Sequence, residues 1–143
     1  MSAKFARFLV LVAAFGLSAL PAVAATKAPD AQMHFKVIAG ANLDRIMSQY
    51  APDATLHWIG GPLNGTYHGK REIKEAWGKF IHKMGKTHET ASAIDVVGDP
   101  KGMTVTANVH FVGKPSVPVR YVLVYRDRKI VDEVWQINAK KSM

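Results

Sequence analysis

The sequence contains no cysteine in its 143 residues, so the chain forms no disulfide and carries no lipid-modified cysteine. This composition is compatible with an oxidising compartment, because no thiol has to be paired there. An internal repeat, a low-complexity linker, a phosphate loop, a dinucleotide-binding fingerprint and a Ser-His-Asp order are also missing. The usual sequence signatures of nucleotide-dependent enzymes and serine hydrolases are therefore absent.

An apolar run from Phe8 to Leu20 follows a short basic segment that contains Lys4 and Arg7. It is shorter than the roughly 20 residues that cross a bilayer. With the small residues of Ala22-Val23-Ala24 after it, this order is typical of a secretory signal peptide. We predict a signal peptide over residues 1–25 and one domain over residues 26–143. The alternative is an N-terminal membrane anchor or a buried helix. We expect a periplasmic or secreted protein with no stable membrane anchor after cleavage.

The chain is basic, with a formal charge of +8. A basic surface can indicate a nucleic-acid partner, but here the lysines are scattered, for example at Lys70, Lys74, Lys79 and Lys83. Aromatic residues do not alternate with them as in a base-stacking platform. A solvated helix face explains them better, and we expect no nucleic-acid partner.

Residue patterns predict helices in the first half of the domain and strands in the second. Residues 29–41 and 42–50 form two helices, with Asn42 as the N-cap of the second, and Pro52-Asp53 ends that helix. The clearest amphipathic helix covers residues 70–84. Strands are expected over residues 54–59, 87–97, 103–112, 117–125 and 129–138. Short turns between successive strands favour a largely antiparallel sheet, and thus an α+β domain.

Three segments carry a family resemblance: NLDRIMSQYAPDATLHW, GTYHGKREIKEAWGKF and VLVYRDRKIVDEVWQI. With the order of elements, they resemble the SnoaL-like and ketosteroid-isomerase-like proteins of the nuclear transport factor 2-like superfamily, over about residues 31–138. The resemblance implies a cone-shaped, curved antiparallel sheet with N-terminal helices packed on its concave face. It also implies a cavity for a small molecule and dimerisation through the opposite face of the sheet. It does not specify an activity, because this fold hosts many functions.

Strand alternation, taken with the resemblance, assigns side chains to the concave face. The last strand is expected to direct Val131, Glu133, Trp135 and Ile137 inward. The predicted ligand-binding residues come from this face and from the helices that close the cavity, and they share an apolar or aromatic side chain, as is usual in small-molecule sites. They are Tyr50, Leu56, Trp58, Trp77, Val109 and Trp135.

Only some of the isomerase's catalytic positions hold a suitable residue in this sequence. The position of its general base falls on Trp58, and those of its two oxyanion donors fall on His34 and Tyr121. Tryptophan cannot abstract a proton, so the isomerase mechanism itself is not supported. Tyr121 can still act as a hydrogen-bond donor to a substrate oxygen, and His34 can do the same.

Glu133 is the predicted acid-base residue, because a carboxylate on an apolar face would have a raised pKa. We predict that His34, Tyr121 and Glu133 are the catalytic residues, with Glu133 and His34 as an acid-base pair. Three alternatives remain open. Glu133 could lie at the cavity mouth, it could pair with Arg120, Arg126 or Arg128, or a one-residue register slip could turn it outward.

The remaining histidines are too dispersed for a metal motif, and neither a metal nor another cofactor is predicted. His57 and His110 are expected on the outer face of the sheet. We expect an exported domain that forms a homodimer, and two functions stay open for it. It either binds a small hydrophobic molecule as a cofactor-independent isomerase, lyase or cyclase, or it is a non-catalytic ligand-binding or protein-interaction module. A metal-dependent enzyme is a weaker third hypothesis.

Overall fold

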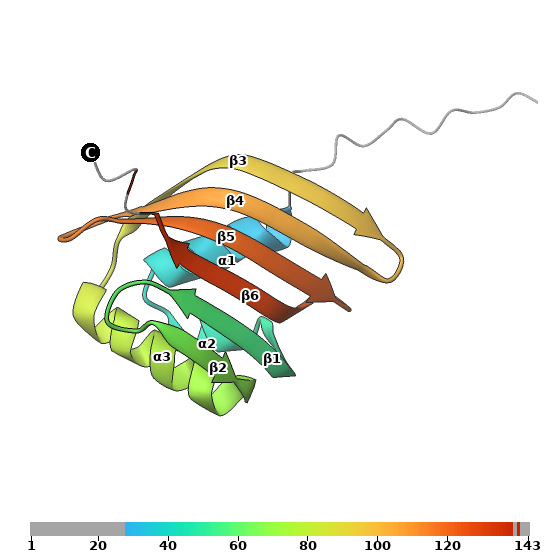
Figure 1. Cartoon of the computed structure of the whole chain (residues 1–143), viewed down its shortest axis with the longest axis horizontal. Coiled ribbons are helices and arrows are strands. Elements are labelled where there is room, and N and C mark those ends of the chain that lie inside the picture. The colour runs from blue at the N-terminus through green and yellow to red at the C-terminus, as the bar shows by residue number, and fades with distance from the viewer. Residues whose placement is uncertain (1–27, 139, 141–143) are drawn as a thin grey trace, which may run out of the picture.

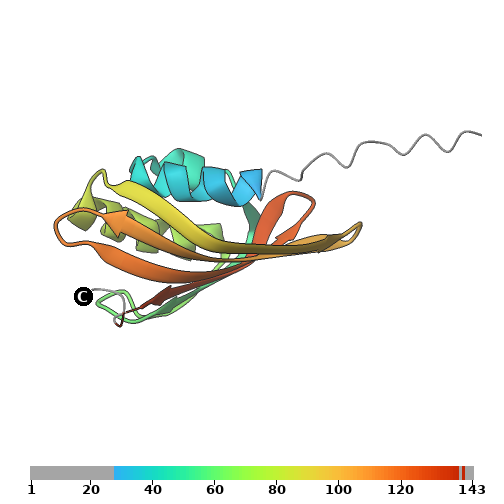
Figure 2. The ribbon, with the colours of Figure 1, turned by 90° about the horizontal axis from the view of Figure 1, so that it is seen from above.

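The computed structural model describes residues 28–138 and residue 140, and the predicted signal peptide lies outside this range. Three helices lie on one side of a bent six-stranded sheet (Figures 1 and 2). The elements in chain order are α1 (Pro29–Ala39), α2 (Leu43–Met47), β1 (Tyr50–Ile59), β2 (Gly65–His68), α3 (Gly69–Met84), β3 (His88–Asp99), β4 (Gly102–Val112), β5 (Val117–Arg126) and β6 (Lys129–Ile137).

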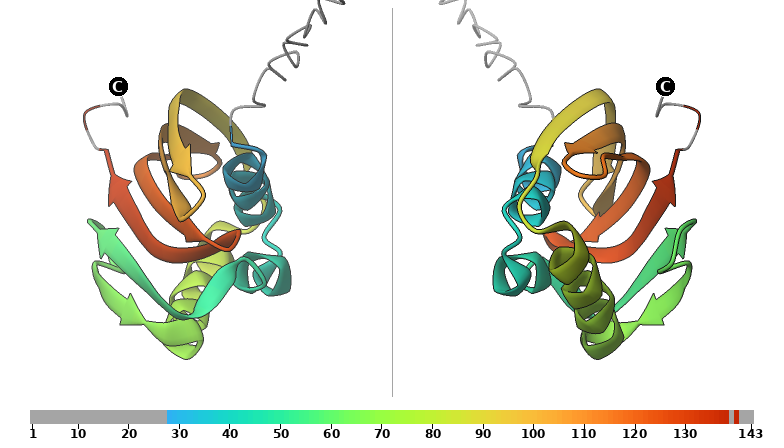
Figure 3. Two further views of the ribbon diagram at one scale, coloured as in Figure 1. Left: turned by 90° about the vertical axis from the view of Figure 1, so that its right-hand side faces the viewer. Right: turned by 90° about the vertical axis from the view of Figure 1, so that its left-hand side faces the viewer.

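The strands follow the order β2-β1-β6-β5-β4-β3 across the sheet. Neighbouring strands are antiparallel except β1 and β6, which run parallel. Seen end-on, the sheet curls around the helices, so its concave face holds them (Figure 3). The predicted α+β fold with a curved, largely antiparallel sheet is therefore confirmed.

The helices match the predicted pattern closely at their starts. The side chain of Asn42 accepts a hydrogen bond from the backbone N–H of Arg45 at 3.0 Å, so the predicted N-cap is confirmed. Helix α3 buries Ile73, Ala76, Trp77 and Phe80, which places its apolar face against β1 and β2. Among the described residues, the helices are too short or too polar to cross a membrane.

The prediction was wrong for residues 48–53 and 65–68. Helix α2 ends at Met47, and Pro52 and Asp53 belong to β1 instead of a turn. Pairing between distant segments explains this, because the N–H of Ile130 donates to the carbonyl of Gln49 at 2.8 Å and holds the chain extended there. Residues 65–68, where no strand was predicted, form the edge strand β2 against β1.

Most of the core lies between the concave face and the helices. Strands β4 and β5 alternate buried and more exposed residues, as predicted from their sequence. Helix α1 packs on β3 and β4 and buries Ala31, His34, Phe35 and Ile38, spaced as one helix face. His34 is thereby placed opposite the sheet, in an otherwise apolar row.

Candidate functional site: a buried polar chain beneath an apolar hollow

His34 and Glu133 meet in the interior, 99 residues apart in sequence. Nε2 of His34 lies 3.1 Å from Oε1 of Glu133, and both side chains are fully buried. On the other side of the ring, Nδ1 of His34 lies 2.7 Å from the side-chain oxygen of Gln49. An amide oxygen only accepts, so Nδ1 carries a proton.

Two more side chains extend this contact. The hydroxyl of Tyr50 donates to Oε2 of Glu133, and the indole N–H of Trp77 donates to the Tyr50 oxygen at 2.8 Å. We call Gln49, His34, Glu133, Tyr50 and Trp77 the buried polar chain. Each carboxylate oxygen of Glu133 has a partner, which is how a buried charged group is tolerated. Burial, and then the charge of Glu133, hold the pKa of Tyr50 well above its usual value.

The inward register of Glu133 is confirmed, but Val131 was wrongly placed beside it. The pairing of β5 with β6 shifts between Val124 and Tyr125, so Tyr125 pairs with Ile130. This irregularity turns Ile130 into the core, while Val131 is only half-buried. A bulge changes the side-chain period locally, which simple alternation does not anticipate.

The arginine partners considered for Glu133 bind elsewhere. Arg120 donates to the side chain of Asn108 at 3.4 Å, and Arg126 donates to the carbonyl of Lys101. Arg128 forms a bidentate pair with Asp30, at 2.7 and 3.2 Å, which ties the β5–β6 turn to α1. The carboxylate of Glu133 is instead held by His34 and Tyr50.

Tyr121 lies next to the buried polar chain without joining it. Its ring centroid is 6.3 Å from that of His34, and its hydroxyl is buried without a hydrogen-bond partner in the part of the chain that the structure describes. Burial, followed by the negative charge of Glu133, raises the pKa of Tyr121 well above its usual value. The Tyr125 hydroxyl and the Trp135 indole N–H are also buried and unpaired there. Three buried polar atoms without a hydrogen-bond partner are unusual in a folded protein.

A cluster of aromatic rings fills the space above these groups. Trp58 stacks on Trp135 with ring centroids 4.7 Å apart, and Trp135 also stacks on Phe111 at 5.2 Å. Trp77 and Phe80 meet the same rings at steep angles. These geometries are the ones that aromatic pairs favour. Aromatic side chains therefore fill the interior at the place where the resemblance implied a cavity.

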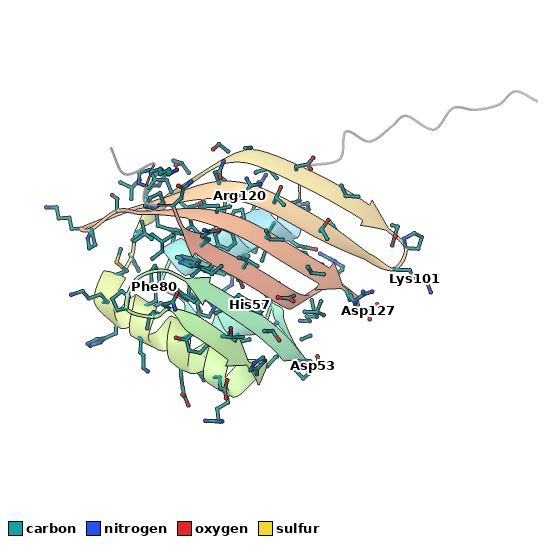
Figure 4. All side chains as sticks on the ribbon, viewed as in Figure 1. Asp53, His57, Phe80, Lys101, Arg120 and Asp127 are labelled. Atoms are coloured by element: carbon teal, nitrogen blue, oxygen red, sulfur yellow. The ribbon has the colours of Figure 1, made fainter. Side chains whose placement is uncertain are left out.

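A hollow of about 640 Å³ lies outside this cluster, and we call it the mouth hollow. It lies between the second half of α3, the β1–β2 loop and the β4–β5 turn. In Figure 4, Phe80 marks this end of the molecule, whereas Lys101 and Asp127 mark the turns at the opposite end. Its lining is Trp58, Pro62, Leu63, Lys79, Phe80, Lys83, Met84, Pro115, Ser116, Val117, Pro118 and Ile137.

The structure does not bring the predicted site residues together at one hollow. Trp58 lines the mouth hollow, and its ring also stacks on Trp135 in the aromatic cluster. Tyr50, Leu56, Trp77 and Trp135 are buried at 0 to 1% exposure and do not line it. Val109 lines a separate, smaller hollow of about 220 Å³. The predicted catalytic residues His34, Tyr121 and Glu133 lie together beneath the cluster and do not line the mouth hollow.

Several residues that line the mouth hollow were not predicted from the sequence. Pro62, Leu63 and Pro115 come from two turns that are far apart in the chain, and Val117 and Pro118 begin β5. The only sequence signal of the turn residues was their apolar character. Gln49 was missed as a partner of His34 because residues 42–50 were expected to be helical throughout.

His57 lies on the outer face of β1, as predicted, with Nε2 3.3 Å from a carboxylate oxygen of Asp132 on β6 (Figure 4). Both side chains are about half exposed, at 40% and 46%. Within residues 28–138, no three histidine or acidic side chains come together as a metal site.

The comparison with protein families agrees with the fold. Residues 31–133 match the model of the SnoaL-like domain. The chain belongs to the SnoaL-like family. The matched residues include the whole buried polar chain, from His34 on α1 to Glu133 on β6. No curated protein matches the chain.

Solved structures show the same fold at low sequence identity. An NTF2-like protein from Pseudomonas putida is 13% identical, with a TM-score of 0.66 over 75% of this chain and 80% of that one. A ketosteroid isomerase-like protein from Erwinia carotovora is 15% identical, with a TM-score of 0.62 over 77% and 92%. A protein with this fold from Catenulispora acidiphila, in complex with trimethylamine, is 16% identical, with a TM-score of 0.60 over 80% and 88%. At these identities the likeness establishes the fold of this SnoaL-like domain alone.

Proposed function

We propose that this SnoaL-like protein binds a small, largely apolar molecule in the mouth hollow, against the indole of Trp58. The observation that carries the proposal is the hollow itself, about 640 Å³ in volume and lined mainly by aliphatic, aromatic and proline side chains. Ligand sites are typically hollows of roughly 300–1,000 Å³ with such a lining. The complex of the Catenulispora protein with trimethylamine supports small-molecule binding on this scaffold.

The packed cluster beneath Trp58 favours binding over catalysis. Trp58, Trp135, Trp77 and Phe80 are each no more than 7% exposed. A ligand in the mouth hollow is therefore separated from His34 and Glu133 by aromatic rings. The buried polar chain then acts as a structural element that fixes α1 against β6.

Isothermal titration calorimetry with 1-octanol tests this proposal. The purified protein is expected to bind 1-octanol saturably at one site. Val117→Trp fills the hollow from β5 and is expected to abolish that binding. Val97→Trp is the matched control, because Val97 is 66% exposed on β3 and does not line the hollow. Absence of binding by the unmodified protein, or equal binding by both variants, would refute the proposal.

A second candidate is an enzyme that uses His34 and Glu133 as an acid-base pair. The specific observation in its favour is the buried hydroxyl of Tyr121, which lacks a partner among the described residues and lies beside the pair. A carbonyl oxygen of a substrate could accept from Tyr121 while the pair moves a proton. That chemistry suits a cofactor-independent isomerase, lyase or cyclase. It requires the aromatic cluster to open.

Proton exchange distinguishes the enzyme from the binding protein. An acid-base enzyme is expected to accelerate the exchange of the acidic protons of 2-cyclohexenone for deuterium in D₂O, measured by NMR. His34→Gln would remove that acceleration, whereas His57→Gln on the outer face would keep it. Exchange at the rate of buffer alone, with the unmodified protein, rejects this candidate for enones.

Export is the third part of the proposal, and it rests on the N-terminal sequence pattern. We expect cleavage after residue 25 and a periplasmic or secreted product. Fractionation of cells that express the whole chain, with N-terminal sequencing of the product, tests this. An intact Met1 on cytoplasmic protein would contradict it.

We also propose a homodimer that forms through the sheet face turned away from the helices. Half-buried valines, among them Val122, Val124 and Val134, lie on that face in the monomer. Light scattering with size-exclusion chromatography gives the mass directly. A single monomeric mass across a wide concentration range would contradict the dimer.

A further inference from the structure

Two lysines line the mouth hollow along with its apolar residues. Lys79 and Lys83 are four residues apart on α3, so they project from the same side of the helix. Phe80 and Met84, their neighbours in the sequence, also line the hollow. The apolar wall of α3 is therefore bordered by a row of two positive charges.

Neither ammonium group is neutralised in the part of the chain that the structure describes. Lys79 and Lys83 are exposed and form no ion pair or hydrogen bond there. The acidic residues of α3, Glu72 and Glu75, pair with Arg71 near the start of the helix. No acidic side chain among the described residues lines the mouth hollow. Lys79 and Lys83 therefore give the hollow a positive charge, and the whole chain is also basic.

We infer that the ligand of the mouth hollow is an apolar molecule that ends in a carboxylate, of the kind represented by a medium-chain fatty acid. This inference rests on the proposed function, since it names the class of molecule for the same hollow. The apolar body lies against Trp58, Leu63 and Ile137. The carboxylate lies at the edge, where Lys79 and Lys83 donate to it.

The chemistry of the two lysines fits this end group. An ammonium group and a carboxylate form a charge-assisted hydrogen bond, which is stronger than one between neutral groups. Lysine can also lay its methylene stem along an apolar ligand while its charge stays in water. A neutral molecule of the same length gains the apolar contacts only. The lysines therefore select the acid over the alcohol.

A pair of probes of equal chain length tests the inference. Octanoate and 1-octanol are titrated into the purified protein by calorimetry at low ionic strength. Octanoate is expected to bind roughly tenfold more tightly, because each exposed ion pair adds a modest gain. The double variant Lys79→Gln/Lys83→Gln is expected to lose the preference, so that it binds octanoate about as weakly as it binds 1-octanol.

The same helix offers a matched control. Lys70→Gln/Lys74→Gln removes the same charge from exposed positions that do not line the hollow. This control is expected to keep the preference for octanoate. Equal affinity for the two probes would overturn the inference and leave the proposed function intact. Equal loss in both double variants would also overturn it, because the attraction would then be general. If neither probe binds, both the inference and the proposed function fail.

Discussion

Trp58 on β1 stacks on Trp135 on β6, with ring centroids 4.7 Å apart and planes 28° from parallel. The two residues are direct partners in the only parallel strand pair among the described strands. Trp58 faces the mouth hollow on one side, and Trp135 faces Phe111, Tyr121 and the interior on the other. This stack separates a surface suited to an apolar ligand from the buried polar chain.

The two tryptophans should contribute unequally to stability. Trp135→Phe is expected to lower the free energy of unfolding by about 2 kcal/mol, because its indole is enclosed on all sides and a smaller ring leaves a void, while loss of the unpaired N–H offsets part of the cost. Trp58→Phe should cost only about 1 kcal/mol, since the void opens toward the hollow. Urea unfolding followed by circular dichroism measures both. Equal losses would show that the stack does not divide the two regions.

Removal of the Glu133 carboxyl group tests the buried polar chain. Glu133→Leu leaves His34 and Tyr50 without their partner and should destabilise the fold by about 3 kcal/mol. Glu133→Gln should cost about 1 kcal/mol, because an amide can accept from Tyr50 and donate to His34. Urea unfolding compares the two variants. A Leu variant as stable as the Gln variant would mean that these hydrogen bonds contribute little.

The buried tyrosines are expected to make the folded state less stable at alkaline pH. Burial, and secondarily the charge of Glu133, raise the pKa of Tyr50, Tyr121 and Tyr125 in the folded protein. In the unfolded chain these groups ionise near pH 10. Below that pH they stay protonated in both states, so their contribution is complete. Above it only the unfolded state loses protons, and the free energy of unfolding falls by about 1.4 kcal/mol per pH unit for each tyrosine.

Tyr121→Phe isolates one of these groups. Between about pH 10 and the higher pKa of the folded state, the variant should lose stability less steeply than the unmodified protein, by about 1.4 kcal/mol per pH unit. Denaturant unfolding at a series of alkaline pH values gives both slopes. Parallel slopes would show that Tyr121 ionises equally in the folded and unfolded states.

Much of the fold followed from local patterns. Helix α3 and strands β4 and β5 carry clear amphipathic or alternating sequences, and the structure agrees with them. The burial of Glu133 beside Trp135 followed from the same alternation. Its meeting with His34 depended on the family resemblance, because no local signal links residues on α1 and β6.

The remaining parts of the site depend on contacts between distant segments. Tyr50 reaches Glu133 only because β1 starts at that residue, and its start is fixed by pairing with Ile130. The bulge at Val131 has no signature in KIVDEV. The mouth hollow needs the β1–β2 loop and the β4–β5 turn to meet at α3, and this depends on the curvature of the whole sheet.

The binding of an apolar molecule in the mouth hollow is tested most directly by NMR of the protein with 1-octanol. Nuclear Overhauser effects are measured between the octanol chain and methyl groups of the protein. Contacts are expected with Met84, Val117 and Ile137, which line the hollow. Contacts confined to Val97 or Val112, which are exposed elsewhere on the sheet, would contradict it.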